Sequence, residues 1–292
     1  MKLGLHIASV PWEGGAPRLR EHLMRIVEAA EAAGFDSIDV ADHVWLHPIM
    51  GGPEKSQLEA YTTLGFIAAR TDKVRLLTLV TAASYRHAGL LAKMVTTLDV
   101  LSGGRAMLGI GAGNYPDEAA GLGLPFPELG CRFDLLEETL QVCLRMWKGE
   151  IGDQRPFKGE HVSLERPLNV PQSLSRPHPP ILIAGAGRHR TLPLVARYAD
   201  ACNLPPSAEI PDQLEWLRQL CQREGRDYGA IEKTAPFGFE VDSKESIAHL
   251  IEKLKWMAGL GIETVFGWVV GADRLEPIQI LGREVIPAVA EF

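Results

Sequence analysis

The sequence predicts an α/β fold, a single (β/α)8 TIM barrel, and two observations carry this prediction. Eight short apolar runs of strand type alternate along the chain with eight segments whose apolar residues recur at helical spacing. Strands that alternate with helices indicate parallel βα units, and eight such units close into a barrel. The strands are expected at about 3–8, 37–42, 74–81, 105–111, 181–185, 201–204, 234–241 and 264–270.

The stretch from Arg86 to Gly113 shows one complete unit of this pattern. Apolar residues from Leu90 to Leu101 fall on one helical face, the run Ser102-Gly103-Gly104 ends the helix, and an apolar strand follows. The same periodicity predicts the remaining helices. They are expected at about 18–33, 58–70, 88–101, 131–148, 190–199, 211–224, 244–259 and 274–290.

One segment departs from the alternation of strands and helices. Residues 148–180 are rich in Pro and Gly and contain only short apolar pieces. Long connections of this kind are either active-site lids or disordered spacers. We expect an insertion over the C-terminal mouth of the barrel that acts as a lid, within one domain that spans residues 1–292.

Composition narrows the class of protein. With 46% hydrophobic and 23% charged residues, the chain has the composition of an ordinary globular protein. Its apolar runs are much shorter than the roughly 20 residues of a membrane span, and the first residues resemble a strand more than a signal peptide. We therefore expect a cytoplasmic protein with no membrane contact.

Charge and cysteine content exclude further classes. The formal net charge of −7, without a basic run, argues against nucleic acid as a partner. Four cysteines are widely spaced and form no CxxC pair, which argues against a zinc site or a dithiol centre. We expect free buried thiols and no metal.

The candidate catalytic residues follow the second predicted strand, because TIM-barrel active sites lie at the carboxyl ends of the strands. Asp42 and His43 stand at this position, with Trp45 and His47 shortly after them. An acid beside an imidazole can carry a proton near neutral pH and fix the histidine tautomer. From spacing alone, a cap at Asp42 and a packed His43 are equally compatible with the sequence.

Two further strand ends could receive a flat ligand. After Leu79, Val80 and Thr81 the third strand changes abruptly to small residues, which would let a planar ring approach the backbone. The fourth strand ends in glycines that allow close approach, followed by the amide of Asn114. An ordinary buried strand and an ordinary turn are the respective alternatives.

The fifth strand runs into a turn that could bind an anion. Gly185, Ala186, Gly187 and Arg188 precede a helix that starts near Thr191. Exposed N–H groups of a small-residue turn, a helix N-terminus and an arginine together favour a phosphate. A purely structural turn is as compatible with these residues.

Several motifs in this order resemble the luciferase-like monooxygenase family, specifically its branch of oxidoreductases that use the deazaflavin coenzyme F420. They are the start RHAG at 86–89, LDVLSGGR at 98–105, GIGAG at 109–113, LRMWKGE at 144–150 and HPPILIAGAG at 178–187. The resemblance covers about residues 1–205. It implies a barrel of bacterial luciferase-like type and hydride transfer to or from a small organic substrate. An FMN-dependent monooxygenase that uses dioxygen is the alternative, and a barrel that binds a ligand without turnover is a third hypothesis.

The resemblance also implies roles for the candidate residues. Asp42 and His43 would contact the deazaflavin ring, with His43 as the proton-handling residue. A bulge with a cis peptide between Leu79 and Val80 would brace the ring, with Thr81 beside it. The turn from Gly185 to Arg188 would hold the cofactor phosphate.

Substrate contacts are expected from Trp45, His47, the loop from Ser9 to Trp12 and the 148–180 insertion. In the sugar-phosphate dehydrogenases of this branch, a glutamate acid stands at the position that matches Asn114, so its absence argues against that particular activity. Relatives commonly dimerise through barrel helices, and we expect a homodimer.

Overall fold

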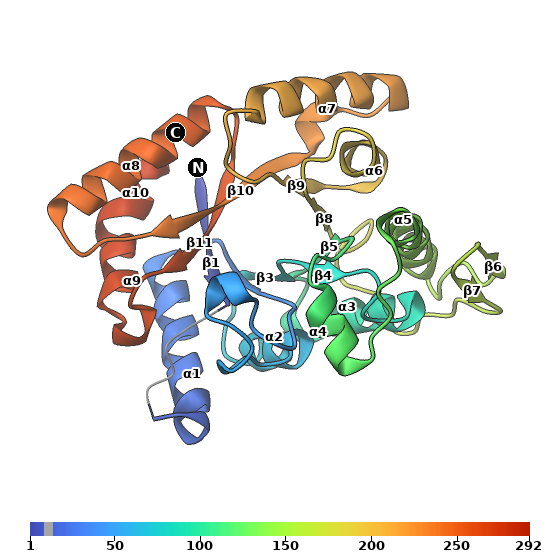
Figure 1. The fold of residues 1–292 in the computed structure, drawn as a ribbon, viewed down its shortest axis with the longest axis horizontal. Coiled ribbons are helices and arrows are strands. Elements are labelled where there is room, and N and C mark those ends of the chain that lie inside the picture. Colours follow the sequence, from blue (N-terminus) through green and yellow to red (C-terminus); the bar gives the residue numbers. More distant parts are fainter. Residues whose placement is uncertain (9–13) are drawn as a thin grey trace.

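Parallel strands close into a barrel in this computed structural model, which describes residues 1–8 and 14–292 (Figure 1). Each strand pairs with the next along the chain, and the last pairs with the first. A two-residue strand, β4 (Thr81–Ala82), continues β3 after an interruption, so the two count as one barrel strand. The predicted eight-stranded barrel is confirmed. Its strands are β1 (Lys2–Ile7), β2 (Ser37–Val40), β3 (Arg75–Thr78), β5 (Ala106–Gly111), β8 (Ile181–Ala184), β9 (Ala201–Asn203), β10 (Glu232–Phe239) and β11 (Thr264–Val269).

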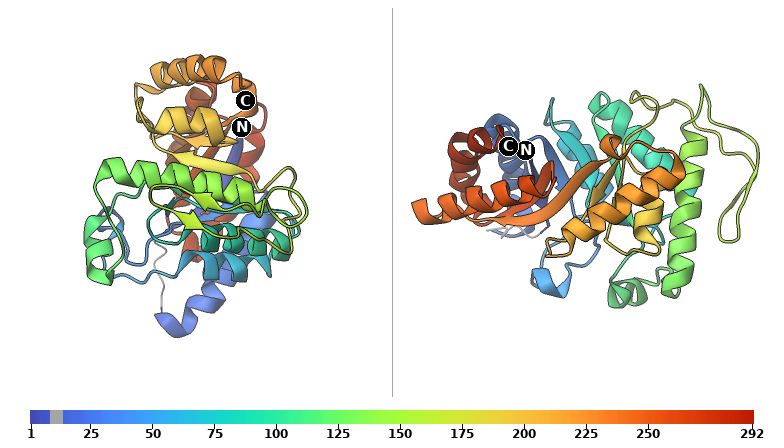
Figure 2. Two further views of the ribbon diagram at one scale, coloured as in Figure 1. Left: turned by 90° about the vertical axis from the view of Figure 1, so that its right-hand side faces the viewer. Right: turned by 90° about the horizontal axis from the view of Figure 1, so that it is seen from above.

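Helices surround the strands, and the two chain termini lie side by side (Figure 2). No helix in the described residues is long and apolar enough to cross a membrane. A π-helical turn, Leu281–Val285, joins α9 to α10, and short 3-10 turns occupy Pro48–Met50, Tyr228–Ala230 and Ala272–Arg274. The helices are α1 (Ala16–Ala33), α2 (Ala60–Ala68), α3 (Ala88–Ser102), α4 (Pro116–Leu122), α5 (Leu129–Met146), α6 (Thr191–Tyr198), α7 (Ile210–Glu224), α8 (Lys244–Gly259), α9 (Glu276–Ile280) and α10 (Ile286–Val289).

Helix α4 is the helical element that the sequence analysis missed. Pro116 stands at its start, Asp117 and Glu118 lie in its first turn, and Gly123 ends it in the left-handed conformation. These are ordinary start and stop signals of a helix. They lie in a short stretch after β5 that was interpreted only as a turn.

Side chains alternate between two cores along each strand. In β1, the side chains of Leu3, Leu5 and Ile7 pack in the large core between barrel and helices. A smaller apolar core fills the barrel interior, as expected for a barrel of this size. It consists of Leu77, Met107, Leu182, Ala201 and Phe266.

An ion pair crosses the amino end of the barrel interior. The Arg75 guanidinium on β3 donates to Asp36 at 2.8 Å and to Glu232 on β10 at 2.9 Å. Strands β3 and β10 lie on opposite sides of the ring of strands, so the side chain spans the barrel. Burial alone would lower the pKa of Arg75, but the two carboxylates outweigh it and raise the pKa, which keeps the guanidinium charged.

The expectation that residues 148–180 lie over the C-terminal mouth is wrong. This segment, with its small hairpin of β6 (Phe157–Lys158) and β7 (Ser163–Leu164), lies outside the barrel beyond α5 (Figures 1 and 2). Asn169 donates to Thr96 of α3 at 3.1 Å, and Asp99 of α3 accepts from the Leu174 amide at 2.6 Å. The physical reason is topological: mouth loops follow strands, whereas this segment follows helix α5.

The tight approach of β3 to β5 generates a prediction about Gly109. A Cβ at this position would lie 1.8 Å from the carbonyl oxygen of Thr78, which is backbone and cannot rotate away. Gly109→Ala should therefore destabilise the protein by about 2 kcal/mol, as overpacking does. Gly65→Ala in α2 is the matched control, since a Cβ there meets no atom of the described residues within 4 Å. Urea unfolding followed by circular dichroism should show a large loss for the first variant and no loss for the second; equal midpoints would contradict this account of the strand contact.

Candidate active site

A cavity of about 490 Å³ opens at the carboxyl end of the barrel. Its walls come from the ends of β2, β3, β5 and β8, with side chains of α5 at its edge. This is the end at which TIM barrels carry their active sites. Of the residues predicted from the sequence, six line it: Asp42, His43, Leu79, Val80, Asn114 and Gly185.

His43 is paired with a buried carboxylate. Its Nδ1 lies 2.9 Å from Oε2 of Glu118, the residue in the first turn of α4. The ring also packs edge-on against Tyr115, with 5.8 Å between the ring centroids. Because an ionised Glu118 can only accept, Nδ1 carries the hydrogen and Nε2 is left for a ligand.

Glu118 organises the loop that follows β2. Its side chain is fully buried and also accepts from the backbone amides of Val44 and Trp45, the latter at 2.8 Å, and from the Tyr85 hydroxyl at 2.5 Å. Burial alone would raise the pKa of Glu118, but the hydrogen bonds from His43 and its other donors outweigh it and lower the pKa. The sequence analysis did not select this residue as a candidate.

Asp42 pairs with Arg86 and not with its neighbour in the sequence, His43. Its two carboxylate oxygens accept from Arg86 at 2.5 and 3.0 Å, and Arg86 also donates to Glu59 at 2.6 Å. The guanidinium lies over the Tyr61 ring, 4.8 Å from its centroid. Burial would lower the pKa of Arg86, but Asp42 outweighs it and raises the pKa, so a charged pair backs the cavity wall.

The wall formed by β3 and β4 contains the bulge that the resemblance implies. The Leu79–Val80 peptide is cis, and both residues line the cavity. Thr81 does not line it. Its buried hydroxyl shares hydrogen bonds with the hydroxyls of Tyr61, at 3.1 Å, and Thr78, at 3.0 Å.

The turn after β8 runs from the cavity to the surface. Gly185, with φ of +117°, lines the cavity beside Thr191 at the start of α6, whereas Ala186, Gly187 and Arg188 lie beyond the lining. Arg188 is exposed, and its guanidinium lies 5.9 Å from the centroid of the Trp216 ring. Among the described residues no side chain caps the N-terminus of α6. The Leu192 amide donates to the carbonyl of Gly187 at 3.0 Å, the Leu194 amide donates to that of Arg190 at 3.3 Å, and residue 193 is a proline, so the Thr191 N–H is the one donor of this turn that no such bond uses.

The residues expected to contact substrate are dispersed. The indole of Trp45 packs against Gly121, outside the cavity lining. His47 does not line the cavity either, and its ring centroid lies 5.7 Å from that of His43 and 4.7 Å from that of Tyr115. Ser9 and Trp12 lie outside the described residues.

Many lining residues were not selected from the sequence as site residues, and three of these carry large aromatic or titratable side chains from different elements. Tyr85 lies in the loop before α3, Trp268 stands half-exposed near the carboxyl end of β11, and His6 points into the cavity from within β1. His6 carried a readable signal, a polar residue at an inward position of an apolar strand. The sequence analysis considered the carboxyl ends of the strands and the residues after them, and His6 lies within β1.

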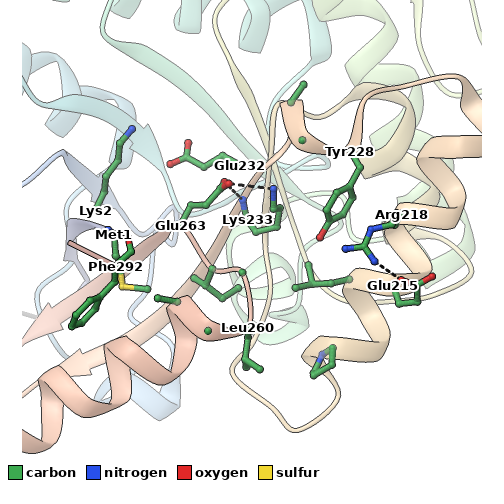
Figure 3. Close-up of a pocket in the computed structure, with 18 residues that line it drawn as sticks. Met1, Lys2, Glu215, Arg218, Tyr228, Glu232, Lys233, Leu260, Glu263 and Phe292 are labelled. Atoms are coloured by element: carbon green, nitrogen blue, oxygen red, sulfur yellow. Dashed lines mark hydrogen bonds and ion pairs between the residues drawn. The ribbon is translucent and has the colours of Figure 1, made fainter. Parts of the chain in front are cut away.

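A second hollow of about 990 Å³ lies at the opposite end of the barrel, between α7, α8 and the chain termini (Figure 3). Charged groups on its walls have partners: Lys233 donates to Glu263 at 3.3 Å, and Arg218 pairs with Glu215. Its place at the amino ends of the strands separates it from the cavity that holds His43.

Comparisons with known proteins show the class of enzyme to which this barrel, with its strand-end residues, belongs. The model of the family described as luciferase-like monooxygenase matches residues 1–262, and the chain belongs to this family. The F420-dependent glucose-6-phosphate dehydrogenase of Microbacterium testaceum is 38% identical to this chain over 285 residues, which cover 88% of this chain and 81% of that relative.

Solved structures share the fold at low sequence identity. An F420-dependent secondary alcohol dehydrogenase in complex with an F420-acetone adduct superposes with a TM-score of 0.81 at 20% identity, over 99% of this chain and 98% of the other. The monooxygenase RslO1 from Streptomyces bottropensis superposes with a TM-score of 0.80 at 22% identity, over 98% and 99%.

The lowered pKa of Glu118 predicts how its contribution to stability depends on pH. The ordinary value is 4.5 and the folded value is lower, so the stabilisation is fully present above about pH 4.5 and is lost as the pH falls through the folded value. Glu118→Gln should cost about 2 kcal/mol at pH 6, the scale of charge-assisted hydrogen bonds, and progressively less at acidic pH. Urea unfolding between pH 3 and 6 measures this, with the exposed Glu128→Gln as control. A cost that stays constant across this range would contradict the assignment.

Proposed function

We propose that this chain is an oxidoreductase that uses the deazaflavin coenzyme F420 to transfer a hydride to or from a small organic substrate. The observation that carries the proposal is the His43–Glu118 pair on the wall of the mouth cavity, with Nε2 left for a ligand. The F420-dependent relative that matches most of the chain supports the choice of coenzyme.

The residues present fit a planar coenzyme. Gly111 and Gly113 leave the wall beside Val80 and Ala82 as bare backbone, because a Cβ at either position would lie 3.0 to 3.2 Å from those side chains. A flat ring can therefore lie against Leu79, Val80 and the backbone before Asn114. Thr81 supports this wall through its buried hydrogen bonds.

The coenzyme phosphate would lie at the turn from Gly185 to Arg188. Within the described residues no backbone hydrogen bond uses the N–H of Ala186, of Gly187 or of Thr191 at the start of α6. Such a turn attracts anions through its N–H groups and the helix dipole, and Arg188 adds a full positive charge. When bound, F420 supplies the carbon that accepts or donates the hydride.

His43 would handle the proton that accompanies the hydride. Glu118 fixes Nδ1–H and stabilises the imidazolium, so Nε2 can take and return a proton without a change of ring orientation. Asp42, whose two oxygens are held by Arg86, would present fixed hydrogen-bond acceptors beside it and orient bound groups. We assign catalytic roles to both residues.

The cavity favours a substrate without a phosphate group. None of the described residues that line it is Lys or Arg, whereas phosphate recognition relies on such side chains. Asn114 also argues against a sugar phosphate as substrate, since the resembling sugar-phosphate dehydrogenases carry an acid at the matching position. Trp45 and His47 do not line the cavity in this structure, and we propose that they and the segment of Ser9 and Trp12 contact substrate when it binds.

We further propose a cytoplasmic homodimer whose subunit is one domain over residues 1–292. The net charge of −7 supports an enzyme that acts on small molecules and does not bind nucleic acid.

The coenzyme and the role of His43 can be tested together. Titration of the purified protein with F420 and with FMN, followed by tryptophan fluorescence, should give tight binding of F420 and weak binding of FMN. His43→Ala should keep F420 affinity within about threefold but slow turnover of any substrate on which the wild type acts by about 10²–10⁴-fold. His161→Ala, in the insertion, is the control. FMN preference would favour the monooxygenase alternative, and undiminished turnover in His43→Ala would remove its catalytic assignment.

The phosphate turn makes a separate prediction. Arg188→Ala should weaken F420 binding about tenfold, the loss of one charge-assisted contact, and should reduce the salt dependence of binding. Isothermal titration calorimetry at two salt concentrations measures both effects. Arg155→Ala, which removes an exposed arginine of the insertion, should leave affinity unchanged. Equal affinity in the two variants would place the phosphate elsewhere.

A further inference from the structure

We infer that His6, paired with Asp39, is a second proton-carrying residue at the floor of the cavity, where it binds the hydroxyl or carbonyl oxygen of the substrate. The inference rests on the proposed function and extends it to a substrate class, small alcohols and the matching carbonyl compounds.

The topology brings these two side chains together inside the barrel. Strands β1 and β2 are hydrogen-bonded neighbours, and His6 stands directly opposite Asp39 in their register. Leu5 and Ile7 on either side of His6 face the helices, as do Ile38 and Val40 beside Asp39. Because side chains alternate along a strand, His6 and Asp39 face the barrel interior.

Packing alone does not account for the pair. Nδ1 of His6 is hydrogen-bonded to Oδ1 of Asp39, whose side chain is fully buried. The other oxygen, Oδ2, is buried and has no hydrogen-bond partner among the described residues. The barrel interior below is apolar, and an apolar pair would fill this layer without the cost of burying ionisable groups. Burial raises the pKa of Asp39 despite the neighbouring imidazole.

The remaining ring nitrogen of His6 is left for a ligand. His6 lines the cavity, and no hydrogen bond within residues 1–8 and 14–292 uses its Nε2. The same arrangement occurs on the cavity wall, where Nδ1 of His43 is held by Glu118. One cavity thus contains two imidazole–carboxylate pairs, one on its wall and one on its floor.

His6 is the side chain on the cavity floor that can carry a proton, because the other titratable groups near it have partners of their own or lie on the wall. Asp42, His43 and Tyr85 line the same cavity, but Asp42 is bound by Arg86 and Tyr85 donates to Glu118. Strands β9, β10 and β11 contribute Asn203, Pro236 and Trp268, which do not titrate. Arg75 and Glu232 neutralise each other at the amino end of the barrel.

Two such pairs match the proton balance of alcohol oxidation. The C–H bond of the alcohol would break, and its electron pair would leave with the hydrogen as hydride to bound F420, the oxidant. Nε2 of His6, neutral at the start, would take the O–H proton as the C=O bond forms. His43, protonated at the start, would supply the one proton that the coenzyme needs besides the hydride, and the two imidazoles would return to their starting states by exchange with solvent. In carbonyl reduction each transfer is reversed, so that atoms and electrons balance in both directions.

The first test follows the imidazole itself. In protein labelled with ¹⁵N-histidine, the resonances of His6 are identified by their loss in His6→Asn. Addition of propan-2-ol and larger secondary alcohols to the protein saturated with oxidised F420 should shift the Nε2 resonance of His6. An unchanged Nε2 resonance at every alcohol concentration tried would overturn the inference.

The second test uses turnover of a panel of small secondary alcohols. His6→Asn should lower kcat at least about 100-fold with F420 affinity unchanged, and Asp39→Asn, as a positioning change, should alter the pH dependence of kcat/KM. His178→Asn, which removes an imidazole near Asp200 outside the cavity, is the matched control. Because loss of a buried partner could impair folding, the double variant His6→Met with Asp39→Met is made alongside; it should fold, bind F420 and lack turnover.

The outcomes separate the two proposals. Failure of the wild type to bind F420 refutes the proposed function. If the double variant binds F420 and turns over alcohols at the full rate, the role of His6 is refuted and the coenzyme assignment stands. The same conclusion follows if the wild type binds F420 but neither oxidises any alcohol nor shows a change in the His6 resonance.

Discussion

Closure of the barrel between β3 and β5 is the constraint on which the rest of the structure depends. The two strands pair at Leu76 and Ala106, the chain then breaks its regular path at Leu79 and Val80, and β4 resumes pairing with the end of β5. The interruption carries two residues onto the cavity wall and requires Gly109 where the backbones approach most closely. The pairing of β3 and β4 with β5, which closes the barrel, therefore also forms the wall against which a flat ring can lie.

Regular features of the fold were predictable from the sequence, and long-range pairing was not. Apolar alternation locates the strands to within a few residues, and helix 244–259 has the predicted bounds. Asp42 and His43 were accessible because they directly follow a strand. Their true partners, Arg86 and Glu118, lie 44 and 75 residues away along the chain, and only packing of the later loops selects them. The insertion was misplaced because composition indicates a long connection but not the end of the barrel at which it lies.

Electrostatics give the cavity its character. Each of its three buried acids has a cationic or imidazole partner: Glu118 has His43, Asp42 has Arg86, and Asp39 has His6. Charge is therefore abundant around the cavity but largely compensated in place, so protons can move locally while little net field acts on a ligand. Such a setting suits a neutral organic molecule better than a strongly anionic one.

The ion pair of Arg75 with Glu232, together with the apolar layer above it, fills the barrel below the cavity and closes its amino end. Any molecule that reaches the cavity floor has to arrive and depart through the mouth where the coenzyme is proposed to sit. If the proposed coenzyme lies nearer this mouth than a ligand on the floor, the release of the two ligands is coupled, because the outer one has to leave first.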